Sequence, residues 1–161
     1  MIFKGKKLTG LMVVIALMGL IGCSSTKKSS EPKTDYAMEL NGDSDSGLAG
    51  RLRSVYFDFD SSVLLGDTRD TLDENIKYLA EHHEVEIQIE GHCDERGSSQ
   101  YNLALGERRA RAVYDYLVAN DIASMRIYII SMGKEKPIAF GHNEEAWSQN
   151  RRANFVITKL R

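Results

Sequence analysis

The sequence predicts an α+β domain in which two helices pack on one face of a small mixed β-sheet. Four short segments between residues 54 and 159 have the alternating or apolar pattern of strands. Two longer segments, 67–81 and 100–120, are rich in helix-forming residues and contain no proline. The resulting order βαβαββ favours a two-layer αβ sandwich with its helices on one side.

The first strand is expected at residues 54–59 and the first helix at 67–81. In that helix Leu72, Ile76 and Leu79 recur at helical spacing, so they are expected to face the core.

The second strand, 85–90, reads VEIQIE, with apolar and polar residues alternating as in a strand with one buried face. The second helix is expected at 100–120, with Ser99 as a plausible N-cap and Gly106 as its only glycine. Its expected core stripe consists of Leu103, Ala110, Val113 and Leu117.

The last two strands are expected at 126–131 and 153–159. The loop between them, residues 133–150, is long and is therefore a candidate functional segment, with a short turn expected near 144–149.

The N-terminus has the pattern of a secretory signal peptide over residues 1–22. Lys4, Lys6 and Lys7 precede an apolar run that would span only about 22 Å as a helix, short of the roughly 30 Å hydrocarbon core. The run ends in LIGC, which resembles a bacterial lipobox and makes Cys23 the expected site of lipidation.

Residues 23–50 are expected to form a lipidated N-terminus and a flexible linker. They are rich in Ser, Lys, Asp and Gly, with few apolar residues to bury. A flexible coil of this length would reach about 29 Å on average. Residues 51–161 then form one domain, long enough for a single core without disulfides. With Cys23 acylated, Cys93 has no partner in the chain and is interpreted as a buried filler.

Charge argues against nucleic acid as a partner. Without the three lysines of the signal peptide, 18 basic residues face 23 acidic ones, a net charge of about −5. Binding to nucleic acid would require the opposite balance.

The candidate site lies in residues 91–110, which read GHCDERGSSQYNLALGERRA. Asp94 follows the second strand, and Arg109 lies on the helix that comes next. At about 100° per residue, Asn102, Leu105 and Arg109 share one sector of the helix, whereas Arg108 points elsewhere. A carboxylate and a guanidinium converging on one ligand would suit a molecule that carries both an ammonium and a carboxylate.

Three segments carry a resemblance to a known family: residues 91–110, VYFDFDS at 55–61 and GHNEEAWSQNRRA at 141–153. Together they resemble the peptidoglycan-associated lipoproteins of the OmpA C-terminal-like family, over residues 51–161. The resemblance implies the same αβ sandwich. It also implies non-covalent binding of the cell wall through the diaminopimelate side chain of the peptide stem.

By this resemblance the pocket also includes residues outside the helix and its preceding turn. They are Phe57, Asp58 and one of the arginines Arg151 and Arg152, of which Arg151 is preferred. The resemblance further implies anchoring in the outer membrane, facing the periplasm, and binding to TolB, the periplasmic propeller protein of the Tol system that acts in cell division. It implies no cofactor and no enzymatic activity.

Three alternatives stay open at this stage. Asp94 and Arg109 could form an ordinary surface salt bridge. The domain could act mainly through protein partners. His92, Cys93, Asp94 and His142 hold suitable atoms for a metal-dependent hydrolase, although consecutive residues at a strand end point to opposite faces.

Overall fold

A computed structural model of the protein describes residues 38–160. The expected signal peptide and the lipidation site, Cys23, lie outside the described residues. Within the described part, no helix has the length and apolar character needed to cross a bilayer.

Four strands form one mixed sheet in the order β1-β4-β2-β3. They are β1 (Val55–Tyr56), β2 (Glu86–His92), β3 (Ile127–Gly133) and β4 (Arg152–Lys159). β2 and β3 run parallel, and β4 lies antiparallel between β1 and β2. The predicted α+β class with a mixed sheet is confirmed.

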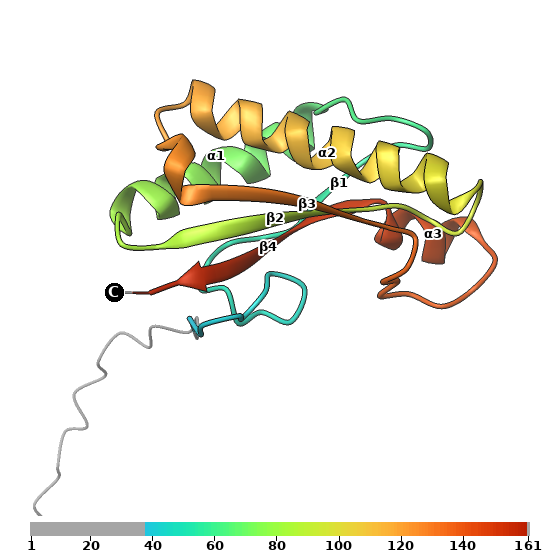
Figure 1. Ribbon diagram of the computed structural model, residues 1–161, viewed down its shortest axis with the longest axis horizontal. Helices are drawn as coiled ribbons and strands as arrows, with labels where there is room; N and C mark the ends of the chain where they lie inside the picture. Colours follow the sequence, from blue (N-terminus) through green and yellow to red (C-terminus); the bar gives the residue numbers. More distant parts are fainter. Residues whose placement is uncertain (1–37, 161) are drawn as a thin grey trace, which may run out of the picture. The chain divides into compact units, whose positions relative to one another are not determined.

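The helices α1 (Gly66–Glu81) and α2 (Ser99–Ala119) cover one face of this sheet (Figure 1). A short 3-10 turn, η1 (Ser124–Arg126), leads into β3, and α3 (Glu144–Asn150) lies at the end of the sheet where β2 stops. Alternate strand residues and one stripe of each long helix form the core between these layers. The fully buried members include Leu72, Leu79, Ile87, Ile89, Val113, Leu117, Phe155 and Ile157.

Two glycines set how closely α2 packs on the sheet. A Cβ atom on Gly91 of β2 would lie 1.8 Å from the carbonyl oxygen of Gly106. A Cβ atom on Gly106 would lie 2.7 Å from the carbonyl oxygen of Gly91. A glycine in a helix interior destabilises the helix, and here the close contact that Gly106 allows compensates for that loss. The contact holds the first turns of α2 against the end of β2.

The structure corrects two details of the predicted elements. β1 has only two residues rather than six, because the chain leaves the sheet after Tyr56 to approach the start of α2. Leu103, expected in the core, is 53% exposed. It lies level with Gly133, the last residue of β3, so its side chain has no sheet beneath it.

The turn expected near residues 144–149 is the seven-residue helix α3. Asn143 is its N-cap, and its side chain accepts a hydrogen bond from the backbone N–H of Ala146 at 3.0 Å. Glu144 and Glu145 follow in the first turn, where acidic side chains interact favourably with the helix dipole.

Residues 38–50, which we call the strap, pack against the domain instead of extending as a linker. The backbone N–H of Asn41 donates to the carbonyl of Ile157 at 2.8 Å, and that of Ser44 donates to Phe155 at 2.9 Å. The strap thereby continues the sheet along the part of β4 that β1 leaves unpaired, and Ala49 is fully buried. The expected linker boundary at residue 50 is therefore too late in the chain.

Candidate functional site

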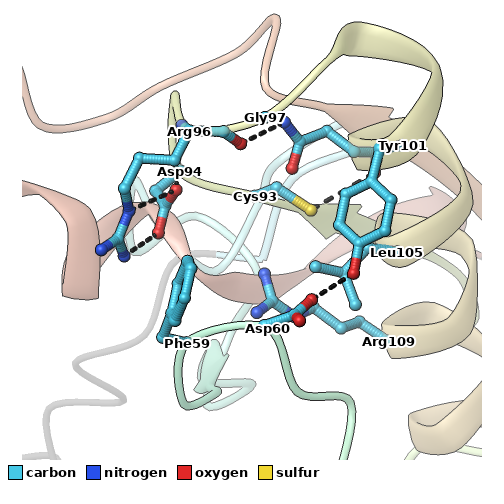
Figure 2. Close-up of a pocket in the computed structure, with 10 residues that line it drawn as sticks. Phe59, Asp60, Cys93, Asp94, Arg96, Gly97, Tyr101, Leu105 and Arg109 are labelled. Atoms are coloured by element: carbon cyan, nitrogen blue, oxygen red, sulfur yellow. Dashed lines mark hydrogen bonds and ion pairs between the residues drawn. The ribbon is translucent and has the colours of Figure 1, made fainter.

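A pocket of about 130 Å³ lies beyond the end of β2 (Figure 2). Its walls come from the loop after β1, the turn between β2 and α2, and the first three turns of α2. The lining residues are Phe59, Asp60, Cys93, Asp94, Arg96, Gly97, Tyr101, Asn102, Leu105 and Arg109. The pocket thus contains four of the seven residues predicted to bind the ligand.

Arg109 reaches the pocket from α2 and is held by three backbone carbonyls. Its Nε donates to Ser61 at 2.8 Å, its Nη1 to His92 at 2.7 Å and its Nη2 to Asp58 at 3.0 Å. A guanidinium has five N–H donors, so two remain available, one on each terminal nitrogen. The ring of Phe57 lies 5.1 Å from the guanidinium carbon.

The charge of Arg109 is not balanced by a neighbouring carboxylate. Within residues 38–160, no Asp or Glu side chain lies within ion-pair distance of Arg109, although the residue is only 1% exposed. Burial lowers the pKa of Arg109 from its ordinary value. Arginine nevertheless stays protonated at neutral pH, so the pocket holds a fixed, unpaired positive charge.

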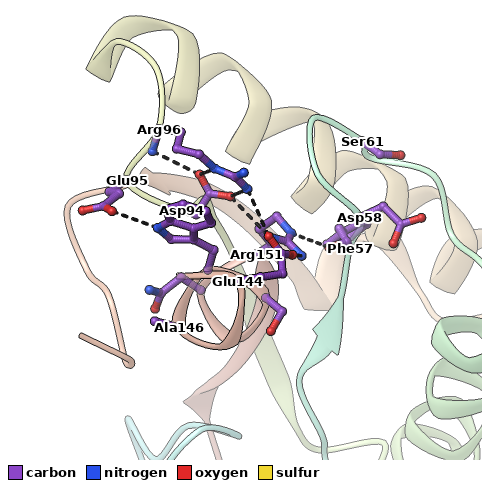
Figure 3. A network of polar contacts seen from close by, with 12 residues as sticks. Phe57, Asp58, Ser61, Asp94, Glu95, Arg96, Glu144, Ala146 and Arg151 are labelled. Carbon is purple, nitrogen blue, oxygen red and sulfur yellow. Dashed lines mark hydrogen bonds and ion pairs between the residues drawn. The ribbon is translucent and has the colours of Figure 1, made fainter. Parts of the chain in front are cut away.

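Asp94 lies in the turn after β2 and is bound by two other arginines (Figure 3). Arg96 binds it through Nε at 3.1 Å and Nη2 at 2.6 Å, and Nη1 of Arg151 lies 3.4 Å away. Burial alone would raise the pKa of Asp94. The hydrogen bonds from Arg96 and Arg151 lower it by more than burial raises it, so the pKa lies below its ordinary value. The carboxylate is therefore charged at neutral pH.

Asp94 and Arg109 line the same pocket without forming an ion pair with each other in the described part of the chain. The alternative of a direct salt bridge between them is thus contradicted. The pocket instead has a negative group on one wall and a positive group on another.

Asn102 and Leu105 contribute to the wall of the pocket that α2 forms. The side chain of Asn102 donates to the carbonyl of Arg96 at 2.7 Å, which ties the turn to α2. The backbone carbonyl of Asn102 accepts a hydrogen bond from the thiol of Cys93 at 3.3 Å. Leu105 is 5% exposed and provides apolar surface. The predicted helical sector therefore faces the pocket.

Three of the predicted residues stand behind the pocket rather than in its lining. Phe57 and Asp58 contact Arg109 through a ring face and a backbone carbonyl, whereas the residue Asp58 itself is exposed. Arg151 is buried behind Asp94, where its Nε donates to the carbonyl of Phe57 at 3.0 Å. Arg152 points away and pairs with Asp45 at 2.7 Å, so Arg151 is the arginine nearer the pocket.

Sequence reasoning missed Phe59, Asp60, Arg96 and Tyr101. The hydroxyl of Tyr101 donates to Asp60, and Arg96 stacks on Phe59 with its guanidinium carbon 3.9 Å from the ring centre. All four lie inside the quoted motif segments, beside residues that were selected. Their roles depend on side-chain pairs between segments about 40 residues apart, which the sequence does not reveal.

The side chains considered for metal binding do not converge. His92 and Cys93 are both buried, but only Cys93 lines the pocket, whereas His92 lies beside Glu90, its Nε2 3.6 Å from the carboxylate. His142 pairs with Glu95 at 2.7 Å. In the described residues, no three His, Cys, Asp or Glu side chains are placed to hold a metal ion.

The chain is similar in sequence to proteins of a known family. The OmpA family model matches residues 56–151. A peptidoglycan-associated lipoprotein of Mesorhizobium japonicum is 38% identical over 148 residues, covering 89% of this chain and 88% of the relative. The family match and the relative both span the residues that form the pocket.

Solved structures agree with this similarity. The crystal structure of the peptidoglycan-associated lipoprotein from Burkholderia pseudomallei is 47% identical, with a TM-score of 0.63, and the match covers 65% of this chain and 89% of that one. The C-terminal domain of Helicobacter pylori MotB is 20% identical, with a TM-score of 0.60, over 63% of this chain and 81% of that one. The second similarity concerns the fold alone.

Proposed function

Because this chain belongs to the OmpA family, we propose that its domain binds peptidoglycan non-covalently in the pocket between β2 and α2. The relatives of similar length are peptidoglycan-associated lipoproteins, and the match covers most of each chain. The proposed activity is binding, with no chemical step.

The observation that carries this proposal is the unbalanced charge of Arg109. A buried guanidinium without a carboxylate is costly unless a partner arrives from outside the chain. Its two unused N–H donors suit a carboxylate, which a planar guanidinium binds through two parallel hydrogen bonds. The pocket is therefore suited to an anionic group on the ligand.

Asp94 can bind a second group of the same ligand, an ammonium. It offers a negative charge within the same small pocket, so the matching ligand carries an ammonium as well as a carboxylate. The side-chain end of diaminopimelate in the peptide stem holds both groups on one carbon. Asn102 and Leu105 line the same pocket, where they would contact that carbon and its neighbouring methylenes.

We further propose that Cys23 carries the lipid that anchors the protein in the outer membrane, with the domain in the periplasm. The chain would then link the membrane to the wall. The family resemblance of its motif segments further implies TolB as its partner, in a Tol system acting at cell division.

Co-sedimentation with diaminopimelate-type peptidoglycan tests the binding proposal. Asp94→Ala and Arg109→Ala should abolish sedimentation with the wall, whereas Arg111→Ala, on the exposed face of α2, should not change it. Thermal unfolding of each variant checks that the fold persists. Asp94→Asn, which keeps the shape of the side chain, provides a second test where Asp94→Ala is unstable. Sedimentation of the folded pocket variants equal to that of the unmodified protein would refute the pocket.

The anchor requires a separate measurement. Mass spectrometry of the membrane-extracted protein should find an acylated Cys23 as the first residue. An unmodified N-terminus would refute the anchor without affecting the pocket.

A further inference from the structure

Arg96 occupies the position on Asp94 that a ligand ammonium would need. Its Nε lies 3.1 Å from Oδ1 of Asp94, and its Nη2 lies 2.6 Å from Oδ2. This is a bidentate pair, the strong geometry for an arginine and a carboxylate. Figure 2 shows the pair at one side of the pocket, with Arg109 across from it.

The carboxylate of Asp94 has no acceptor position to spare. Oδ1 accepts from the backbone N–H and the Nε of Arg96, and Oδ2 accepts from Nη2 of Arg96 and Nη1 of Arg151. A carboxylate has about four acceptor positions. An incoming ammonium must therefore displace one of these donors.

The side chain of Arg96 is the donor best able to leave. The side chain of Arg151 is only 7% exposed, and it is also held by the carbonyl of Phe57 and the carboxylate of Glu144. The side chain of Arg96 is 30% exposed and forms its hydrogen bonds to Asp94 alone. Displacing it leaves the rest of the network intact.

The surroundings of Arg96 provide a second position for its charge. Its guanidinium carbon lies 3.9 Å from the ring centre of Phe59 and 4.1 Å from that of Trp147. Nη2 also lies 3.8 Å from the carboxylate of Glu144, which is 63% exposed. A rotation toward Glu144 would keep the guanidinium paired and partly stacked on Trp147.

We propose that Arg96 is an internal competitor for the ammonium subsite, which closes onto Asp94 in the free protein and is displaced by the ligand. This inference deepens the proposed function and rests on it. A ligand with an ammonium alone must break the bidentate pair with little compensation. A ligand that also binds Arg109 through its carboxylate gains a second interaction. Arg96 therefore raises selectivity for zwitterions at some cost in affinity.

The test measures binding of free meso-diaminopimelate to the full-length protein by calorimetry. Arg96→Met removes the charge and keeps an unbranched, flexible side chain, whereas Arg111→Met removes the same charge from the exposed face of α2. We expect Arg96→Met to bind about tenfold more tightly than the unmodified protein. Arg111→Met should bind as the unmodified protein does. Arg96→Met should also bind 1,5-diaminopentane, which has ammonium groups only, with a smaller disadvantage relative to diaminopimelate.

Fluorescence of Trp147, the single tryptophan of the chain, gives an independent readout. Displacement of Arg96 changes the cation next to the indole, so saturating diaminopimelate should alter emission in the unmodified protein. The change should be much smaller in Arg96→Met.

The outcomes separate this inference from the proposed function. Equal or weaker binding by Arg96→Met, with clear binding by the unmodified protein, would overturn the competitor role and leave the zwitterion pocket in place. Unchanged Trp147 emission at saturation would overturn it as well. Absence of binding by both proteins would refute the pocket itself, and the inference with it.

Discussion

Two buried arginines in this domain differ in whether a carboxylate pairs with their guanidinium. Arg152, on β4, pairs with Asp45 of the strap at 2.7 Å and is 2% exposed. Arg109, on α2, is 1% exposed, and its guanidinium donates to three backbone carbonyls and lies beside the ring of Phe57. A carboxylate thus balances the charge of Arg152, whereas no carboxylate in residues 38–160 pairs with Arg109.

The difference separates a structural ion pair from a binding site. On the strap side, Asn154 accepts from the hydroxyl of Ser44 at 2.7 Å, and the hydroxyl of Ser54 donates to Asp45 at 2.5 Å. This polar cluster fastens the strap to the sheet. At the pocket, the fixed guanidinium keeps two donors unused. Buried charge by itself therefore does not mark a site, whereas buried charge without a partner does.

The largest effect on stability is expected from Asp45→Ala. It would leave Arg152 buried without a carboxylate, and removing one partner of a buried pair typically costs about 3 kcal/mol. Urea unfolding should show a loss near that size. Asp70→Ala, at an exposed position of α1, should change the free energy of unfolding by less than about 0.5 kcal/mol. A loss below about 1 kcal/mol for Asp45→Ala would mean that the strap contributes little.

Arg109→Lys should have a smaller effect, on binding rather than on stability. Lysine keeps the charge but loses the planar fork, so we expect affinity for meso-diaminopimelate to fall about tenfold, or about 1.4 kcal/mol. The matched change Arg152→Lys should leave affinity unchanged and lower stability instead. Unchanged affinity in Arg109→Lys would mean that charge alone, without the paired donors, accounts for recognition.

The smallest expected effect is a difference in pH dependence between the two regions. Burial lowers the pKa of His92, and the nearby carboxylate of Glu90, 3.6 Å from Nε2, only partly offsets this lowering. Because the folded pKa lies below the unfolded one, His92 contributes stability above about pH 6.5 that is lost as the pH falls toward the folded pKa. The free energy of unfolding should therefore decrease from pH 7.5 to pH 5.5, and less so in His92→Gln.

Binding in the pocket should not follow that change. The pKa of Asp94 lies below its ordinary value, so the carboxylate stays charged above about pH 4 and loses its charge only as the pH falls through the depressed pKa. Affinity for diaminopimelate, measured by calorimetry, should be level between pH 7.5 and pH 5.5. A parallel decrease in affinity would indicate that a histidine takes part in binding.

Much of the fold could be predicted because its local patterns agree with its packing. Alternation in 85–90 and helical spacing in 67–81 both correspond to buried faces in the structure. The pattern gave a wrong result for Leu103, where the helix extends past the sheet, and for β1, which stops after two residues. Both errors arise because the point at which a strand ends depends on tertiary packing rather than on local propensity. That point decides which side chains are buried against the sheet.

The strap could not be recognised from composition. Its polar residues resemble those of a linker, yet Ser44 and Asp45 bond to side chains of β4 that are more than 100 residues away in sequence. In the same way, Arg96 was overlooked because its importance lies in occupying Asp94. The strap contacts have no signature in the local sequence, and although Arg96 lies only two residues from Asp94, the sequence does not show that their side chains pair.

The sequence by itself determined the class of the fold, the helical sector with Asn102, Leu105 and Arg109, and the presence of an acid before that helix. These follow from periodicity, which acts over a few residues. Only the tertiary structure decided which charges are balanced: Arg152 by Asp45, Asp94 by Arg96 and Arg151, and Arg109 by no carboxylate in residues 38–160. Apart from the local pair of Asp94 with Arg96, these pairings join segments far apart in the chain, and the distances between them are fixed only when the sheet, the helices and the strap pack together.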